Sequence, residues 1–230
     1  MIDRQSLNAP VSAGAHDVDL IGVVAVESTM GTPLYESARA LLPGARSLVV
    51  FGMEVYPEVL DLVEPEKVMG EASARDLYAP HLDYLNGRMN RAIYELARSL
   101  RREGYRALPL PSVGTPTDGR FQRGILSFKH AAALAGLGRI GWSSLLVTPK
   151  FGPRVRLACL LTDASLDPTG ASVDNPCNGC GECATRCPAG AISGAATGQP
   201  YAINKFACCA YRGAAGACST CMQCCPSGRG

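Results

Sequence analysis

The stretch CNGCGECATRCP, residues 177–188, spaces four cysteines as C-x2-C-x2-C-x3-C and follows the last one with a proline. Three thiolates two residues apart on a tight loop can converge on one inorganic centre, and Gly179 and Gly181 suit a backbone that curls closely around it. Ten of the eleven cysteines lie between residues 177 and 230, a segment with few large apolar side chains. Such a segment buries too little apolar area to fold by itself, so we expect bound metal to hold it together.

This spacing is that of the cysteine run of bacterial two-cluster ferredoxins, in which three thiolates bind one 4Fe–4S cube and the fourth binds the other. A zinc site is the alternative interpretation. Zinc is usually closed by four ligands in two separated pairs, which a triple run followed by Cys-Pro does not resemble. The sequence therefore predicts two 4Fe–4S clusters.

A second group of cysteines is less regular, and two assignments compete. In one, Cys218, Cys221 and Cys224 repeat the ferredoxin triple. In the other, the unit is C-x2-C-x3-C-P, formed by Cys218, Cys221 and Cys225, with Cys208 or Cys209 as a further ligand. We favour the second because it ends both motifs on Cys-Pro, which leaves Cys209 and Cys224 spare. The predicted ligands are then Cys177, Cys180, Cys183 and Cys225 for one cluster, and Cys187, Cys208, Cys218 and Cys221 for the other.

The chain before the cysteines has the pattern of a mixed domain. Val18–Val26 and Ser47–Val55 are β-branched runs of strand length, and apolar residues every three or four positions predict one long helix over Pro80–Glu103. The alternation in Arg154–Thr162 predicts a strand with one buried side, with Cys159 in the core. We expect an α+β protein with two domains, residues 1–170 and residues 171–230, the second being a small ferredoxin-type domain.

Composition excludes some classes of protein. Hydrophobic residues make up 47% of the chain and charged residues 18%, which excludes a disordered chain. A net charge of +2 gives no support to a nucleic-acid or membrane surface, so we expect no nucleic-acid partner. Residues 1–15 lack the apolar core of a secretory signal, and we expect a cytoplasmic protein whose thiols bind metal.

Gly136, Gly138 and Gly141 spell G-x-G-x-x-G, but an alanine-rich helical stretch, Phe128–Ala135, precedes them where a dinucleotide site requires a strand. We interpret these glycines as a helix exit and a close backbone approach, either to another strand or to a flat ligand. The three histidines, His16, His81 and His130, form no pair with metal-ligand spacing. Three cations, Lys150, Arg154 and Arg156, either meet a phosphate or an acidic electron donor, or form a solvated strand end.

From Lys129 to Cys225 the sequence resembles the epoxyqueuosine reductase superfamily, whose members are in turn similar to the cofactor half of reductive dehalogenases. The resemblance rests on AGLGRIGWSSLLVTPKFGPRVRLACLLTDASL, CNGCGECATRCPAGAI, ACCAYRG and CSTCMQCCP. It implies a nitroreductase-like α+β domain that binds cobalamin, and a two-cluster module that supplies electrons to the cobalt. Within it, the glycine-rich segment Ala135–Gly141 and the pair Cys208 and Tyr211 match the superfamily's pattern. The residues implied to face the cofactor are Lys129, His130, Gly136, Gly138, Gly141, Trp142 and Tyr211.

The chain also departs from that superfamily. Where epoxyqueuosine reductases carry an acidic residue in an Asp-Ser-Ala-Pro segment, this chain reads LPSVGTPTDG, residues 110–119, in which Asp118 is the one acid. The sequence also stops five residues after Cys225, and we therefore do not expect reduction of epoxyqueuosine in transfer RNA.

The expected function is an iron–sulfur oxidoreductase that passes single electrons through two clusters to cobalamin or to a corrinoid partner. Its electrons would come from a low-potential donor protein, and its substrate would be a corrinoid or another small molecule. A ferredoxin-type module without a substrate of its own is one alternative, and an FMN-dependent reductase is another.

Overall fold

The computed structural model describes residues 18–63, 68–69, 72–170, 173–194 and 201–229. Its residues fall into two compact units, each assembled from segments that are separate in the chain. Unit 1 comprises residues 1–53, 85–137 and 156–172, and unit 2 comprises residues 54–84, 138–155 and 173–230. The predicted division near residue 170 stays a prediction. His16 and the rest of residues 1–17 lie outside the described residues.

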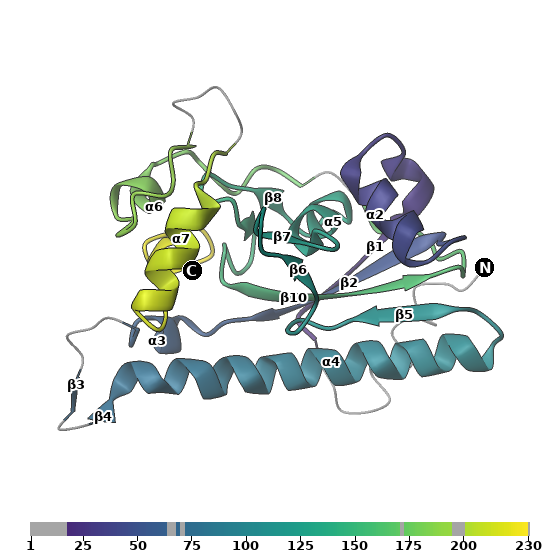
Figure 1. The fold of residues 1–230 in the computed structure, drawn as a ribbon, viewed down its shortest axis with the longest axis horizontal. Coiled ribbons are helices and arrows are strands. Elements are labelled where there is room, and N and C mark those ends of the chain that lie inside the picture. The colour runs from purple at the N-terminus through teal and green to yellow at the C-terminus, as the bar shows by residue number, and fades with distance from the viewer. Residues whose placement is uncertain (1–17, 64–67, 70–71, 171–172, 195–200, 230) are drawn as a thin grey trace. The chain divides into compact units, whose positions relative to one another are not determined.

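Unit 1 is organised around a four-stranded sheet, labelled in Figure 1. Its strands, in spatial order, are β1 (Leu20–Ala25), β2 (Ser47–Glu54), β10 (Val155–Thr162) and β5 (Ala107–Leu110). β1 pairs antiparallel with β2, and β10 pairs antiparallel with β5. The β-branched and aromatic residues of β2 are buried from Ser47 to Met53, as suits a strand inside a sheet. The expected mixture of helix and sheet is confirmed.

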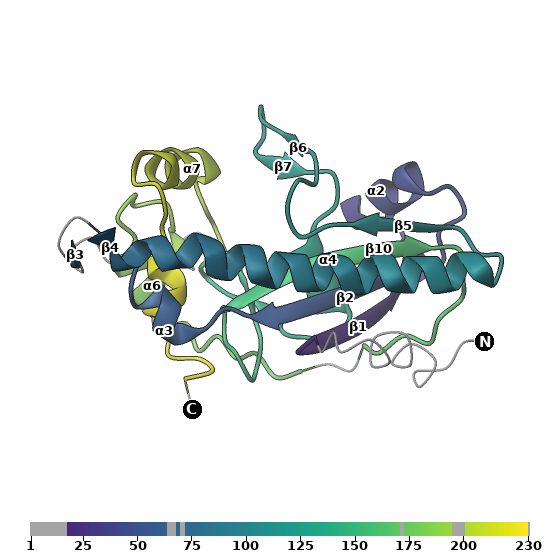
Figure 2. The ribbon, with the colours of Figure 1, turned by 90° about the horizontal axis from the view of Figure 1, so that it is seen from below.

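Helices cover this sheet. The long helix α4 (Tyr78–Arg102) buries the predicted face, including Leu85, Met89, Ile93 and Leu100. Figures 1 and 2 show its unit 1 part running along one face of the sheet. α5 (Phe128–Leu134) packs against β1, where a Cβ at Gly22 would lie 2.6 Å from the Cβ of Ala135. The remaining helical segments of this unit are η1 (Val26–Thr29) and α2 (Pro33–Leu41).

The prediction for β10 was wrong in one respect. Its residues are buried on both faces from Ala158 to Thr162, not on one side only. The reason is its place between β2 and β5, because a strand inside a sheet has neighbours and covering layers that an edge strand lacks. Cys159 is completely buried, so its assignment to the core is confirmed.

Unit 2 contains short elements and little hydrophobic core. Beside the first turns of α4, its described residues form two helical segments and two hairpins between residues 54 and 155, and three helices near the C-terminus. None of α6, α7 or α8 contains a buried residue. The elements are α3 (Pro57–Leu60), β3 (Val68–Met69), β4 (Ala72–Ser73), η2 (Ala74–Leu77), β8 (Arg139–Ile140), β9 (Leu146–Val147), α6 (Glu182–Thr185), α7 (Lys205–Ala214) and α8 (Thr220–Gln223).

A further hairpin, β6 (Thr117–Asp118) with β7 (Arg123–Gly124), belongs to unit 1 and contains Asp118. Within the described residues, no helix is both long and apolar enough to cross a bilayer.

Candidate metal centre

The first cysteine run of unit 2 forms a tight loop. Gly179 and Gly181 have φ angles of +74° and +80°, a left-handed conformation that glycine adopts without strain, as predicted. The side chains of Asn175 and Asn178 accept hydrogen bonds from the backbone N–H groups of Cys177 and Cys180, at 3.2 and 3.1 Å. These Asx turns fix the loop so that successive cysteines project toward its inside.

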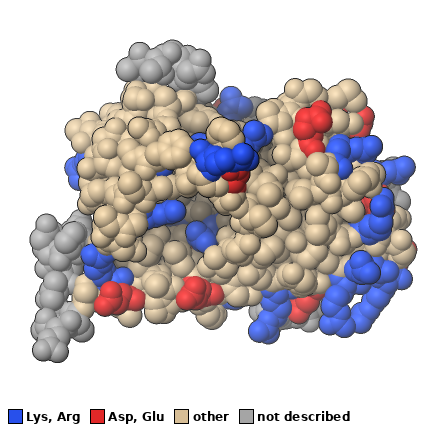
Figure 3. Space-filling model, in the orientation of Figure 1, with Lys and Arg blue, Asp and Glu red and all other residues tan. Residues whose placement is uncertain are grey.

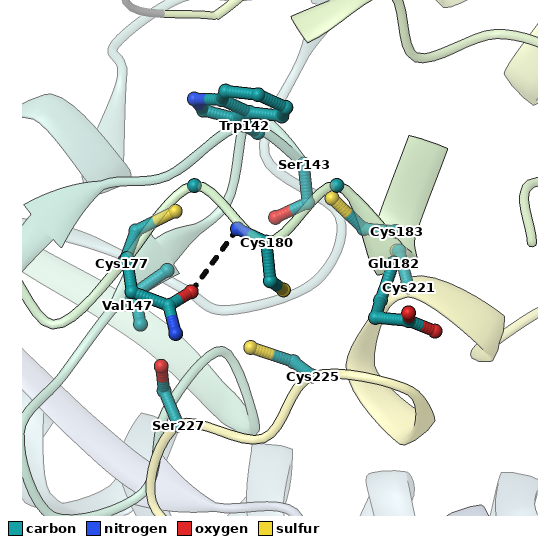
Figure 4. Close-up of a pocket in the computed structure, with 13 residues that line it drawn as sticks. Trp142, Ser143, Val147, Cys177, Cys180, Glu182, Cys183, Cys221, Cys225 and Ser227 are labelled. Atoms are coloured by element: carbon teal, nitrogen blue, oxygen red, sulfur yellow. Dashed lines mark hydrogen bonds between the residues drawn. The ribbon is translucent and has the colours of Figure 1, made fainter. Parts of the chain in front are cut away.

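A pocket brings the first predicted set of ligands together. Cys177, Cys180, Cys183 and Cys225 all line it, and so does Cys221, which the sequence assigns to the second cluster. Figure 4 shows the sulfur atoms of Cys177, Cys180 and Cys225 turned toward one another, with a dashed line marking the hydrogen bond to the Cys180 N–H. Burial, followed by the charges of Cys224, Cys177, Cys225 and Cys180, raises the pKa of Cys183 to about 11.

The second predicted set gathers around Cys221. Burial, followed by the charges of Cys218 and Cys208, raises the pKa of Cys221 to about 12. Burial also raises the pKa of Cys208, together with the charges of Cys209, Cys187 and Cys218, whereas Arg212 opposes the shift. The backbone N–H of Ala191 donates a hydrogen bond to Cys187 Sγ at 3.3 Å. The sulfurs of the second set therefore influence one another electrostatically, and Cys224 and Cys183 also act on Cys221.

None of the eleven cysteines, all of which lie among the described residues, forms a disulfide. Across the described residues, no three His, Cys, Asp or Glu side chains form a site that could hold a single metal ion. Cys224 is half-buried beside Cys225, and burial followed by the Cys225 thiolate raises its pKa. Cys209 follows Cys208 on α7. The choice of Cys225 over Cys224, and of Cys208 over Cys209, stays a prediction.

The glycine-rich segment packs against this loop. Gly136 has a φ of +77° at the end of α5, which confirms the predicted helix exit. A Cβ at Gly138 would overlap the carbonyl oxygen of Val147, and one at Gly141 would lie 3.3 Å from Cys177 Sγ. The predicted close backbone approach is thus confirmed, and its partners are β9 and the cysteine loop.

Trp142 is half-buried over the same loop, as Figure 4 shows. A Cβ at Gly194 would lie 2.8 Å from the indole Cε3, and one at Gly179 would lie 3.4 Å from Cζ2. The indole therefore lies against the first cysteine run, where its large apolar surface excludes water. A stacking contact of Trp142 with a macrocycle stays a prediction.

The other residues assigned to a cofactor by resemblance are distributed over both units. Lys129 and His130 lie in α5 of unit 1, where His130 Nδ1 is 2.6 Å from Ser127 Oγ. Gly136 also belongs to unit 1, whereas Gly138, Gly141, Trp142 and Tyr211 belong to unit 2. Tyr211 lies on α7 with 37% of its surface exposed.

Sequence reasoning missed the place of Arg154. A solvated strand end is wrong for this residue, which is completely buried and donates to the Ser227 carbonyl at 2.9 Å. Of the other two cations, Lys150 is exposed, and Arg156 donates to the Asn86 side chain in unit 1. The Ser227 hydroxyl in turn donates to the Pro176 carbonyl at 2.6 Å, which ties the C-terminal segment to the first cysteine loop.

Comparison with known proteins gives two groups of relatives. No protein-family profile matches the chain. It is 41% identical over 108 residues to a tetrachloroethene reductive dehalogenase of Dehalobacter restrictus, a match that covers 46% of this chain and 18% of the dehalogenase. It is 25% identical over 229 residues to an epoxyqueuosine reductase of Synechococcus, covering 93% of this chain and 62% of that enzyme. The chain is a relative of both groups.

Solved structures agree with these matches. A catabolic reductive dehalogenase aligns with a TM-score of 0.70 and 21% identity, over 100% of this chain and 32% of that one. A selenomethionine-labelled epoxyqueuosine reductase aligns with a TM-score of 0.60 and 21% identity, over 99% of this chain and 66% of that one. The predicted superfamily resemblance is confirmed, and the fold is shared. The chain spans 18% of the dehalogenase and about three-fifths of the Synechococcus reductase.

The comparisons also bear on cofactor and partner. One similar reductive dehalogenase structure, with a TM-score of 0.69, is described in terms of B12-dependent dehalogenation, and no support for FMN emerges. Another neighbour, with a TM-score of 0.60, is an epoxyqueuosine reductase bound to a tRNA stem loop. That neighbour shares the fold and binds nucleic acid, which counts against the expectation of no nucleic-acid partner. Net charge averages over the whole surface, whereas Lys and Arg gather locally, as on the face in Figure 3.

Proposed function

We propose that the chain is an iron–sulfur redox protein in which two 4Fe–4S clusters in unit 2 pass single electrons to cobalamin or to a corrinoid partner. The observation that carries the proposal is the convergence of Cys177, Cys180, Cys183 and Cys225 on one pocket. A second set of thiols around Cys221 supports the second cluster.

The donor set fits iron–sulfur clusters on chemical grounds. Soft thiolates favour such clusters, and the predicted ligand thiols other than the exposed Cys180 are at least partly buried. The pKa values of Cys183 and Cys221 are raised because burial and neighbouring thiolates penalise the anions. Bound iron would relieve that penalty, because metal binding drives thiol deprotonation and adds its binding free energy to folding.

The residues around the thiols have distinct tasks in this proposal. When bound, the clusters supply one-electron storage. The left-handed glycines let the loop curl, the indole of Trp142 keeps water from it, and the Ala191 N–H stabilises negative charge on Cys187 Sγ. Water exclusion and hydrogen bonds to sulfur are two of the factors that set a cluster's reduction potential.

Cobalamin is supported by the relatives, and the residues assigned to it here fit it only in part. Gly138, Gly141 and Trp142 are already packed against β9 and the cysteine loop within unit 2. Lys129 and His130 of unit 1 remain the proposed cofactor residues, together with Gly136 and Tyr211. These residues are divided between the two units, so neither described unit alone contains a complete surface for a corrin ring. The electron donor, the cytoplasmic location and the nitroreductase-like and ferredoxin-like domain types likewise remain part of the proposal.

The test is anaerobic purification followed by iron and acid-labile sulfide analysis. The proposal predicts about eight irons per chain, in two four-iron clusters. Hydroxocobalamin is then added and the protein is passed through gel filtration. Retained cobalamin supports binding by the chain itself, and clusters without retained cobalamin favour the carrier that reduces a partner. A chain that contains zinc or disulfides instead would contradict the proposal.

A matched pair of variants sharpens this test. Cys180→Ser removes a predicted ligand of the first cluster, and Cys209→Ser removes a thiol that the favoured assignment leaves spare. We expect iron to fall to about four per chain in the first variant and to stay at about eight in the second. Equal iron contents in the two variants would contradict the ligand assignment.

A further inference from the structure

Arg154 is a buried cation in a unit that buries few other side chains. It is 0% exposed, although arginine is almost never fully buried unless it is paired. Its NH2 group donates to the Ser227 carbonyl at 2.9 Å, and its NH1 group lies 3.4 Å from the carbonyls of Met222 and Cys225. Its Nε has no hydrogen-bond partner among the described residues. The hydrogen bonds of its side chain therefore all fall on the segment that contains Cys225.

The position of this guanidinium is fixed by its surroundings. The turn before it is closed by two hydrogen bonds between Thr148 and Gly152, at 2.8 and 3.0 Å. The turn touches the C-terminal segment so closely that a Cβ at Gly152 would overlap the Ser227 carbonyl. On the strand side, the Val55 N–H donates to the Arg154 carbonyl at 2.9 Å. The side chain thus reaches Cys225 from an anchored backbone.

The charge of Arg154 has no direct counter-ion in the described part of the chain. No Asp or Glu of the described residues forms a salt bridge with it. Its guanidinium instead lies against the backbone carbonyls of Met222, Cys225 and Ser227.

We infer that Arg154 is a positioning residue that fixes Cys225 as a ligand of the first cluster and raises the reduction potential of that cluster. The inference rests on the proposed function. A cluster gains one negative charge when it takes up an electron, and a buried cation beside a ligand stabilises the more negative state. Burial makes the effect large, because solvent and salt screen an exposed cation far more than a buried one.

The test is an EPR-monitored redox titration of the anaerobic holoprotein and three variants. Arg154→Gln removes the charge and keeps a hydrogen-bond donor, whereas Arg154→Lys keeps the charge and loses the guanidinium fork. Arg229→Gln removes an exposed cation from the same C-terminal segment, where it bonds to Asp61 and to the Gln223 carbonyl.

We expect Arg154→Gln to lower the equilibrium constant for reduction of the first cluster at least tenfold, which is about 59 mV for a one-electron couple. Arg154→Lys should retain most of the wild-type value, and Arg229→Gln should shift it little because that side chain is 41% exposed. The second cluster should keep its potential in all three variants, which makes it an internal reference.

The outcomes separate the inference from the proposed function. Equal shifts in Arg154→Gln and Arg154→Lys, or no shift in either, would overturn the inference, because charge would then not matter. Loss of the first cluster from Arg154→Gln alone would support it, and loss from both variants would overturn it in favour of a purely steric role. A wild-type protein without clusters would instead overturn the proposed function.

Discussion

Replacing Gly138 with alanine tests how the glycine-rich segment works. The new Cβ would overlap the Val147 carbonyl oxygen, and it would lie 2.9 Å from the Val147 carbonyl carbon and 3.0 Å from Thr148 Cα. All three neighbours are backbone atoms, two in β9 and one in the residue after it. Backbone atoms cannot rotate away as a side chain can. Relief requires opening of the β8–β9 pair, in which Arg139 faces Val147. Overpacking of this kind costs about 3 kcal/mol, the upper part of the usual range.

The measurement is urea unfolding followed by the fluorescence of Trp142, the one tryptophan of the chain, which lies in the same unit. With a denaturant slope of about 2 kcal/mol per molar urea, the midpoint should fall by about 1.5 M. Gly87→Ala is the matched control, because a Cβ there has no atom within 4 Å and the residue lies inside α4. It should stabilise by about 0.5–1 kcal/mol. An unchanged midpoint in Gly138→Ala would refute the close approach. It would instead favour the hypothesis that the glycines make room for a ligand.

Three further predictions concern the cysteines, the pH dependence and the sheet. Cys224→Ser should leave about eight irons per chain by chemical analysis, and a fall to about four would reverse the choice between Cys224 and Cys225. The Arg106 side chain, 2.8 Å away, holds the pKa of Asp163 below its usual range, so this pair stabilises the fold above about pH 4 and the contribution is lost as the pH falls through the lowered pKa. Asp163→Asn should therefore flatten the acid limb of a stability-against-pH curve by up to about 1 kcal/mol, since Arg106 is largely exposed, and an unaltered limb would contradict this. Gly22→Ala should lower the thermal midpoint, because the new Cβ would meet Ala135 at 2.6 Å; equal midpoints would show that α5 yields without cost.

Much of the sheet-and-helix unit was predictable because its signals are local. The spacing of Leu85, Met89, Ile93 and Leu100 specifies one face of a helix, and the structure buries that face in α4. Strand β2 matches its β-branched run to within one residue. The burial of β10 on both faces was not predictable, because it depends on which strands flank it. The order of strands in a sheet cannot be inferred from the sequence of one strand.

The cysteine site was predictable for a different reason. Ligands two residues apart on a short loop are necessarily near one another, so the sequence places Cys177, Cys180 and Cys183 together without knowledge of the fold. Arg154 shows the limit of such reasoning. Its side chain contacts Met222, Cys225 and Ser227, which lie about seventy positions away in the chain. A local sequence pattern cannot predict a contact over that separation.

Iron-edge anomalous diffraction from anaerobically grown crystals tests the central claim most directly. The account predicts two four-iron peaks, one enclosed by Cys177, Cys180, Cys183 and Cys225 and the other by Cys187, Cys208, Cys218 and Cys221. Anomalous signal at the zinc edge, or sulfur–sulfur bonds among these cysteines, would contradict it.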